Sequence, residues 1–211
     1  MGIYLQLHPV SPQRRYIRHA VEVVRGGGVI VYPTDSCYAL GCRIGDKAAL
    51  ERIREIRQTD RNHHFTLVCR DLADVGKYAI VDNSQYRLLR AHTPGPFTFL
   101  LKASRETPRR LKHERFGTIG LRVPDHPVTA LLLAELGEPV MSSTLLLPGE
   151  QSPRTDAREI YERLERSVDL VLDGGNCGLI ATSVIDLSGD RAVVVREGRG
   201  DVSPFRDAPP V

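Results

Sequence analysis

Short apolar runs rich in β-branched residues alternate along the chain with segments of helical apolar spacing, and Gly and Pro residues separate them. The helical spacing predicts one helix that starts at Ser11-Pro12 and ends at glycines 26–28, and others over 47–57, 72–78, 84–91, 128–136 and 157–164. The apolar runs predict strands over 29–32, 65–69, 97–101, 118–123, 140–143, 170–172, 183–187 and 192–196. This alternation is typical of an α/β protein, and the tight turns between some strands indicate a large twisted sheet that is mixed.

The size of the chain fits one such domain, and no linker or repeat marks a second one. Of its 211 residues, 41% are hydrophobic and 26% charged, which excludes a disordered, fibrous or membrane-spanning chain. The longest apolar stretch, residues 130–134, is far shorter than the roughly 20 residues of a bilayer helix. The first ten residues carry no signal-peptide core. The four cysteines lack CxxC spacing, so we expect neither a disulfide framework nor a metal site, and a cytoplasmic location.

Two polar segments follow predicted strands, at the place where open α/β sheets bind their ligands. The first runs from Tyr32 to Ser36 and contains Thr34. The second contains Arg122, which leaves a strand just before the helix start at His126, where backbone NH groups favour anions. The alternative for each segment is an ordinary polar turn, since Thr and Asp often cap turns locally. Neither GxGxxG nor GxxxxGK[ST] occurs, so neither nucleotide motif is indicated.

Clustered arginines suggest a site for phosphate groups. Arg54, Arg57 and Arg61 recur at helical offsets, and guanidinium groups form bidentate bonds to phosphate oxygens. The alternative is a solvated helix face on which Glu51 pairs with Arg54.

A second basic run lies at residues 105–115. It contains Arg109, Arg110 and Lys112. An RNA-facing patch and a solvated loop are both open interpretations, because no aromatic residue within the run can stack a base.

Four stretches, taken in order, resemble the YrdC family of threonylcarbamoyl-AMP synthases: GGVIVYPTD (27–35), PGPFT (94–98), GLRVP (120–124) and SST (142–144). Three more are similar to the YciO branch: IRQ (56–58), CRDL (69–72) and VVREG (194–198). The resemblance implies a single YrdC-like domain over 11–199, with an N-terminal extension over 1–10 and a C-terminal tail over 200–211. It also implies a basic concave cavity in a twisted mixed sheet that helices flank.

The resemblance further implies a cytoplasmic nucleotidyltransferase that condenses ATP, L-threonine and bicarbonate into threonylcarbamoyl-AMP, for N6-threonylcarbamoyladenosine in tRNA. ATP would be a substrate with Mg²⁺ as a candidate counter-ion, and no membrane is implied. Transferred motif by motif, Thr34 and Arg122 would bind threonine. The nucleotide would contact Arg57, Thr98, Thr118, Ser142, Thr144 and Arg196. No catalytic residue and no residue that binds a metal is implied.

Two synthase motifs are not kept. Where the synthases carry KxR the chain has Arg57-Gln58-Thr59, and where they carry SxN it has Thr144-Leu145-Leu146. Because each lost polar group costs a few kcal/mol of binding, the departures predict weak or altered synthase activity. The alternative is a protein that binds double-stranded RNA or tRNA without synthase activity, as some relatives bind double-stranded RNA. That RNA would contact Arg54, Arg61, Arg109, Arg110 and Lys112.

Overall fold

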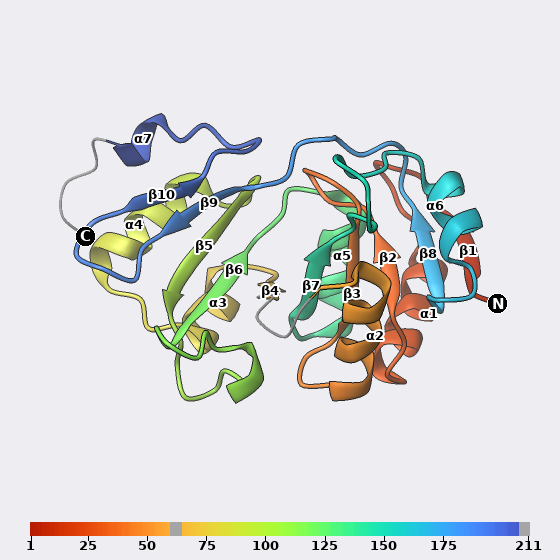
Figure 1. Ribbon diagram of the computed structural model, residues 1–211, viewed down its shortest axis with the longest axis horizontal. Helices are drawn as coiled ribbons and strands as arrows, with labels where there is room; N and C mark the ends of the chain where they lie inside the picture. The colour runs from red at the N-terminus through yellow and green to blue at the C-terminus, as the bar shows by residue number, and fades with distance from the viewer. Residues whose placement is uncertain (60–64, 207–211) are drawn as a thin grey trace.

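The computed structural model describes residues 1–59 and 65–206. The strands are β1 (Ile3–Gln6), β2 (Ile30–Tyr32), β3 (Ala39–Arg43), β4 (Thr66–Val68), β5 (Phe97–Lys102), β6 (Thr118–Arg122), β7 (Val140–Thr144), β8 (Leu170–Asp173), β9 (Ser183–Asp186) and β10 (Val193–Arg196). They form one sheet in the order β1-β8-β2-β3-β7-β4-β6-β5-β9-β10 (Figure 1). Parallel pairs such as β4–β6 and β5–β9 lie beside antiparallel pairs such as β3–β7 and β5–β6, so the predicted α/β fold with a mixed sheet is confirmed.

The described residues also form seven helices and one 3-10 turn, of which the last helix follows the last strand. They are α1 (Arg14–Arg25), α2 (Lys47–Arg57), α3 (Leu72–Tyr78), α4 (Asn83–His92), η1 (Arg109–Leu111), α5 (Pro127–Leu136), α6 (Ala157–Leu164) and α7 (Ser203–Arg206). Every helix and strand predicted from the pattern is present. Four elements were not predicted: the four-residue strand β1, strand β3, and the short elements η1 and α7.

Both flanks of the predicted domain contribute to the fold. Strand β1, from the predicted N-terminal extension, pairs in parallel with β8. Phe205 of α7, in the predicted tail, is buried with its ring centroid 5.5 Å from that of Phe97. The boundaries 11–199 stay a prediction, but the packed sheet and core include residues on either side of them.

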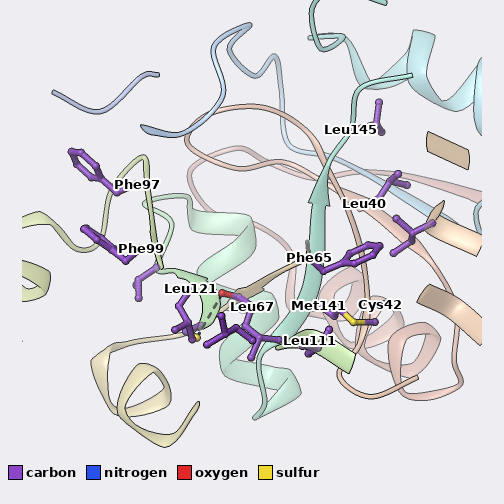
Figure 2. Close-up of a cluster of buried hydrophobic side chains, with 14 of the residues drawn as sticks. Leu40, Cys42, Phe65, Leu67, Phe97, Phe99, Leu111, Leu121, Met141 and Leu145 are labelled. Atoms are coloured by element: carbon purple, nitrogen blue, oxygen red, sulfur yellow. Dashed lines mark hydrogen bonds between the residues drawn. The ribbon is translucent and has the colours of Figure 1, made fainter. Parts of the chain in front are cut away.

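Two apolar clusters fill the sheet faces. On one face, Ile17 and Val24 of α1 and Leu132 of α5 pack on β2 and β8. The other cluster includes side chains of α2, α3, α4 and α6, and Figure 2 shows its central part, where Phe99, Leu121 and Leu67 lie in one row.

Successive side chains of β5 and β6 point alternately into the core and toward the opposite face of the sheet. Phe97, Phe99 and Leu101 are in the core cluster, and the side chains between them, Thr98 and Leu100, project from the opposite face. Figure 1 shows α3 and α4 on one side of these strands, and no helix of the described residues lies across the other side. One face of this part of the sheet is therefore free to form a cavity.

Residues 1–59 and 65–206 contain no helix that is long and apolar enough to cross a membrane. The four cysteines are free thiols.

Candidate functional site

A cavity of about 600 Å³ occupies the open face of the sheet. The floor of the cavity is formed by residues that are cross-strand partners on neighbouring strands. On β7, β4, β6 and β5 these are Ser142, Thr66, Gly120 and Leu100. Thr98, Val184 and Arg196 are partners in the same way on β5, β9 and β10. The walls come from the end of α2 and from two loops, with Arg57, Leu146, Gln151, Pro153 and residues 179–182.

Arg122 is the most buried cation of this cavity, with 8% of its side chain exposed. Its Nη2 donates to Asp35 Oδ1 and, at 3.3 Å, to Ser36 Oγ. The other oxygen of Asp35 accepts the backbone NH of Asp125 at 2.9 Å, so the carboxylate is fixed from two sides. Arg122 Nε has no hydrogen-bond partner among the described residues. A buried donor without a partner is costly. Arg122 also lines the cavity, so its guanidinium provides positive charge there for an anionic group.

Arg57 ends helix α2 and reaches the same cavity. Its Nη1 donates to Ser143 Oγ, and its Nε donates to the carbonyl oxygen of Leu146 at 3.4 Å. Burial lowers the pKa of the Arg57 guanidinium from its ordinary value, but an arginine keeps its charge at neutral pH. A partly dehydrated cation binds a phosphate oxygen more strongly than a fully solvated one does.

Arg196 lies at the far side of the cavity and is exposed. Its Nη2 and Nε donate to the carbonyl oxygen of Thr182 at 2.9 and 3.2 Å. The hydroxyl of Thr182 is 2.9 Å from that of Thr98. These bonds fix one face of the guanidinium and place two hydroxyl groups beside it.

The structure brings together five of the six residues predicted to contact a nucleotide. Arg57, Thr98, Ser142, Thr144 and Arg196 all line the cavity that contains Arg122. Their nucleotide-binding roles stay predictions.

Two of the predicted nucleotide contacts are less favourably placed. Thr118, at the other end of β6, is not among the lining residues and lies about 13 Å along the strand from Arg122. The Ser142 hydroxyl accepts from Tyr32 at 2.7 Å and donates to the Leu40 carbonyl at 3.1 Å, so its donor is already used.

Thr34 does not line the cavity of Arg122. It borders a neighbouring cavity of about 430 Å³, together with Asp35 and Arg199. Its hydroxyl donates to the Cys37 carbonyl oxygen at 2.7 Å, as in the polar-turn alternative. Its threonine-binding role stays a prediction.

The described residues predicted to contact RNA come from α2 and from the segment around η1, and Arg109 and Arg110 line one small cavity together with Lys47 and Leu50 of α2. Arg54 is 16% exposed and pairs with Glu51 at 2.7 Å, which confirms that predicted ion pair. Arg109 and Arg110 are exposed at η1, and Lys112 Nζ donates to the Ser104 carbonyl oxygen at 2.7 Å. Arg61 lies outside the described residues. Their contacts with RNA stay predictions.

Sequence reasoning missed Asp35 as a site residue. It lies within the segment 32–36 that was singled out, but its partner Arg122 is 87 residues away. The only available signal was the acidic residue directly after a strand-end Pro-Thr.

Comparison with known proteins gives consistent matches. The model of the family Sua5_yciO_yrdC, described as telomere recombination, matches residues 22–198. The chain is 54% identical to YciO of Escherichia coli (strain K12) over 97% of this chain and 100% of that protein. The crystal structure of E. coli YciO superposes with a TM-score of 0.93 over the same shares.

Two further relatives extend the comparison to synthases. A threonylcarbamoyl-AMP synthase of Nitrosococcus oceani is 33% identical over 75% of this chain and 85% of that protein. Sua5 of P. abyssi, crystallised with L-threonine, is 24% identical and shares the fold, with a TM-score of 0.85 over 93% of this chain and 58% of that one. The chain therefore belongs to the Sua5/YciO/YrdC family, is YciO-like, and is related to the threonylcarbamoyl-AMP synthases.

Proposed function

We propose that this chain is an ATP-dependent synthase of the threonylcarbamoyl-AMP type, with activity weaker than or altered from that of the related synthases. The observation that carries the proposal is Arg122, a buried cation paired with Asp35, in one cavity with Arg57 and Arg196. The relationship to named synthases supports the reaction class.

The reaction joins three substrates in two steps. The amine nitrogen of the amino acid bonds to the bicarbonate carbon with loss of water, which gives a carbamate. A carbamate oxygen then attacks the α-phosphorus of ATP, the bond from that phosphorus to the bridging oxygen breaks, and pyrophosphate leaves with the electron pair. Both steps depend on holding the reactants together and on cations near the developing negative charge.

The cavity supplies groups for each part of this reaction. Arg57 and Arg196 are the cations for phosphate oxygens, and Arg122 binds the carboxylate of the amino acid. No carboxylate lines the cavity among the described residues, and Mg²⁺ prefers carboxylates together with substrate phosphates. We therefore propose Mg²⁺ only as a counter-ion that enters with ATP.

Two differences from the synthase motifs support weak or altered activity. Thr59 stands where the second motif cation is expected, and it does not line the cavity. Leu146 stands where the amide is expected, and it does line the cavity. Each change removes hydrogen bonds to charged groups, worth about 1.5–3 kcal/mol each.

The test is pyrophosphate release from ATP with L-threonine and bicarbonate, each omitted in turn. Release that requires all three substrates supports the proposal. ATP binding in a calorimeter without release contradicts synthase activity and leaves a nucleotide-binding protein. Arg191→Ala is a matched control, because Arg191 is an exposed arginine outside the cavity, and its rate is expected to equal that of the unchanged chain.

One observation favours RNA binding as a second candidate function. Phe116, directly after the basic run 105–115, is 63% exposed, and the guanidinium of Arg115 lies 5.2 Å from its ring centroid. An exposed aromatic ring beside cations is a platform on which a base can stack. RNA affinity that falls steeply with salt, and that Phe116→Ala lowers about tenfold or more, supports this function. Unchanged affinity in Phe116→Ala contradicts the use of this surface.

A further inference from the structure

A small cavity of about 230 Å³ lies between the start of α2 and the segment of η1. Its floor is apolar, because it is formed by Leu50, Leu111 and Met141, which are at most 5% exposed and belong to the core cluster. Figure 2 shows Leu111 and Met141 close together beside Cys42. Among the described residues, this cavity shares no lining residue with the cavity of Arg122. It is therefore a separate place at which a ligand can bind.

Three exposed cations line the same cavity. Lys47 comes from the start of α2, and Arg109 and Arg110 come from η1. Within residues 1–59 and 65–206, none of these three side chains forms an ion pair. The one carboxylate among the described lining residues is that of Asp46, whose Oδ1 accepts the backbone NH of Ala49 at 3.0 Å and so caps α2. The charge around the cavity is therefore positive and has no counter-charge among the described side chains that matches it.

The apolar floor and the cations suit two parts of one ligand. Water in an apolar cavity finds few hydrogen-bond partners, so an apolar group that displaces this water gains affinity. A cavity of about 150 Å³ lined by apolar side chains is large enough to hold benzene. The cavity between α2 and η1 is larger, so it has room for an apolar body of one ring. Guanidinium and ammonium groups beside that body bind carboxylate and phosphate oxygens.

We propose that the cavity between α2 and η1 binds a small amphipathic anion, whose apolar body of about one ring fills the floor and whose carboxylate or phosphate contacts the three cations. This site is separate from the proposed synthase site and does not depend on synthase activity. The apolar floor favours such a ligand over RNA, because the phosphates of RNA would use the cations and leave the floor empty.

The experiment measures the dissociation constants of fluorinated probes for the full chain by ligand-observed fluorine NMR. The anions are para-fluorobenzoate and para-fluorophenyl phosphate, and para-fluorobenzyl alcohol is an uncharged probe with the same ring. We expect at least one anion to bind about tenfold or more tightly than the alcohol, because hydrogen bonds to charged groups strengthen binding by about that factor. Added salt should weaken this binding. Equal affinities of the anions and the alcohol, or no binding of either anion, would overturn the inference.

Variants locate the bound anion. Arg109→Ala combined with Arg110→Ala should lower its affinity about tenfold or more, and Lys47→Ala should lower it from the opposite wall. Because these residues are exposed, the thermal midpoint should change little. Arg115→Ala is the matched control, since Arg115 is an exposed cation of the same basic run that does not line the cavity. Its affinity for the anion should stay within about twofold of that of the unchanged chain.

Three outcomes would contradict this assignment. Unchanged affinity in the combined arginine variant, with a loss in Arg196→Ala instead, would place the anion in the cavity of Arg122. Trifluoroacetate carries the charge without a ring and should bind about tenfold or more weakly than para-fluorobenzoate, because it leaves the floor unfilled. Equal affinity of these two anions would show that the cations act without the cavity. Binding of a double-stranded RNA oligonucleotide that the combined arginine variant weakens, with no binding of the small anions, would assign these cations to RNA.

Discussion

Strands β2 and β8 and strands β5 and β6 belong to one sheet but use its two faces differently. Every residue of β2 is fully buried: Ile30 and Tyr32 pack in the cluster of α1 and α5, while Val31 packs in the other cluster. Along β6, Ile119 and Leu121 are in the core, and Arg122 lines the cavity instead. The first pair of strands therefore contributes both faces to stability, and the second pair contributes one face to stability and one to ligand binding.

The open face of β6 also holds a buried charge. Arg122 lies on that face, with Asp35 as its counter-charge. A buried charge is tolerated when it is paired and hydrogen-bonded, as the guanidinium of Arg122 is with Asp35 and Ser36.

The largest effect is expected from breaking the ion pair on the open side. Arg122→Ala and Asp35→Ala should each lower the free energy of unfolding by about 3–5 kcal/mol, because each leaves its partner as an unpaired buried charge. The double variant should lose less than the sum of the two single losses. Urea denaturation measures all three. Additive losses would show that the pair is not coupled.

A Leu→Ala substitution should lower the free energy of unfolding by unequal amounts in the two regions. Leu170→Ala, on fully buried β8, should cost about 3 kcal/mol of unfolding free energy, because it leaves a cavity under α1. Leu100→Ala, on the open face of β5, should cost less than about 1.5 kcal/mol, since the side chain is only partly buried. Equal losses measured by urea denaturation would remove the distinction between the two regions.

Arg196→Ala should lower the affinity for ATP and leave the stability of the protein nearly unchanged. We expect ATP affinity to fall about 10- to 100-fold through loss of bonds to phosphate, and the free energy of unfolding to change by about 0.5 kcal/mol or less at this exposed site. Calorimetric titration and denaturation test the two parts. The exposed Arg191→Ala serves as the control, and equal ATP affinity in both variants would exclude Arg196 from the site.

Restoring the missing motif groups should raise the synthase activity of the cavity on the open face. Thr59→Arg with Leu146→Asn adds a cation and an amide, and we expect pyrophosphate release to rise about tenfold, which corresponds to about 1.4 kcal/mol of transition-state stabilisation. Each single variant is the control. No gain in the double variant would mean that the site has changed beyond these two positions.

Much of this arrangement could be predicted from local pattern. The run 30–32 is uniformly apolar, as expected of a strand covered on both faces, and the strands of the open side were also found. Strand β3 was missed because Ala39 and Gly41 have low strand propensity, and its place between β2 and β7 comes from tertiary packing.

Residues of the site could be predicted from the sequence, but the contacts between them could not. Arg122 could be singled out at a strand end, but its pairing with Asp35 joins residues 87 positions apart, which no local pattern encodes. For the same reason the sequence could not show that the Thr34 hydroxyl is used within its own turn. Phe116 was overlooked because it lies one residue beyond the basic run, and its exposure depends on the fold.

The smallest effect concerns His126, which caps α5 beside the neighbouring cavity. Its Nδ1 accepts the backbone NH of Val128 at 3.3 Å, which requires the neutral ring. Burial lowers the pKa of His126 from its ordinary value, and Asp35 and Asp125 oppose this shift only in part. The folded state thus binds the proton less readily than the unfolded state does. The stabilisation from His126 is fully present above the ordinary histidine pKa of about 6.5 and is lost as the pH falls below it.

Urea denaturation between pH 7.5 and 5 should therefore show a decline in the free energy of unfolding, of less than about 1.4 kcal/mol per pH unit. His126→Asn keeps a side chain that can cap the helix but does not titrate, so it should flatten the decline over this range. An unchanged slope in His126→Asn would assign the pH dependence to other groups. Because His126 borders the neighbouring cavity rather than that of Arg122, ATP affinity at pH 7.5 should be the same in both proteins, which separates the stability of this helix end from binding on the open face.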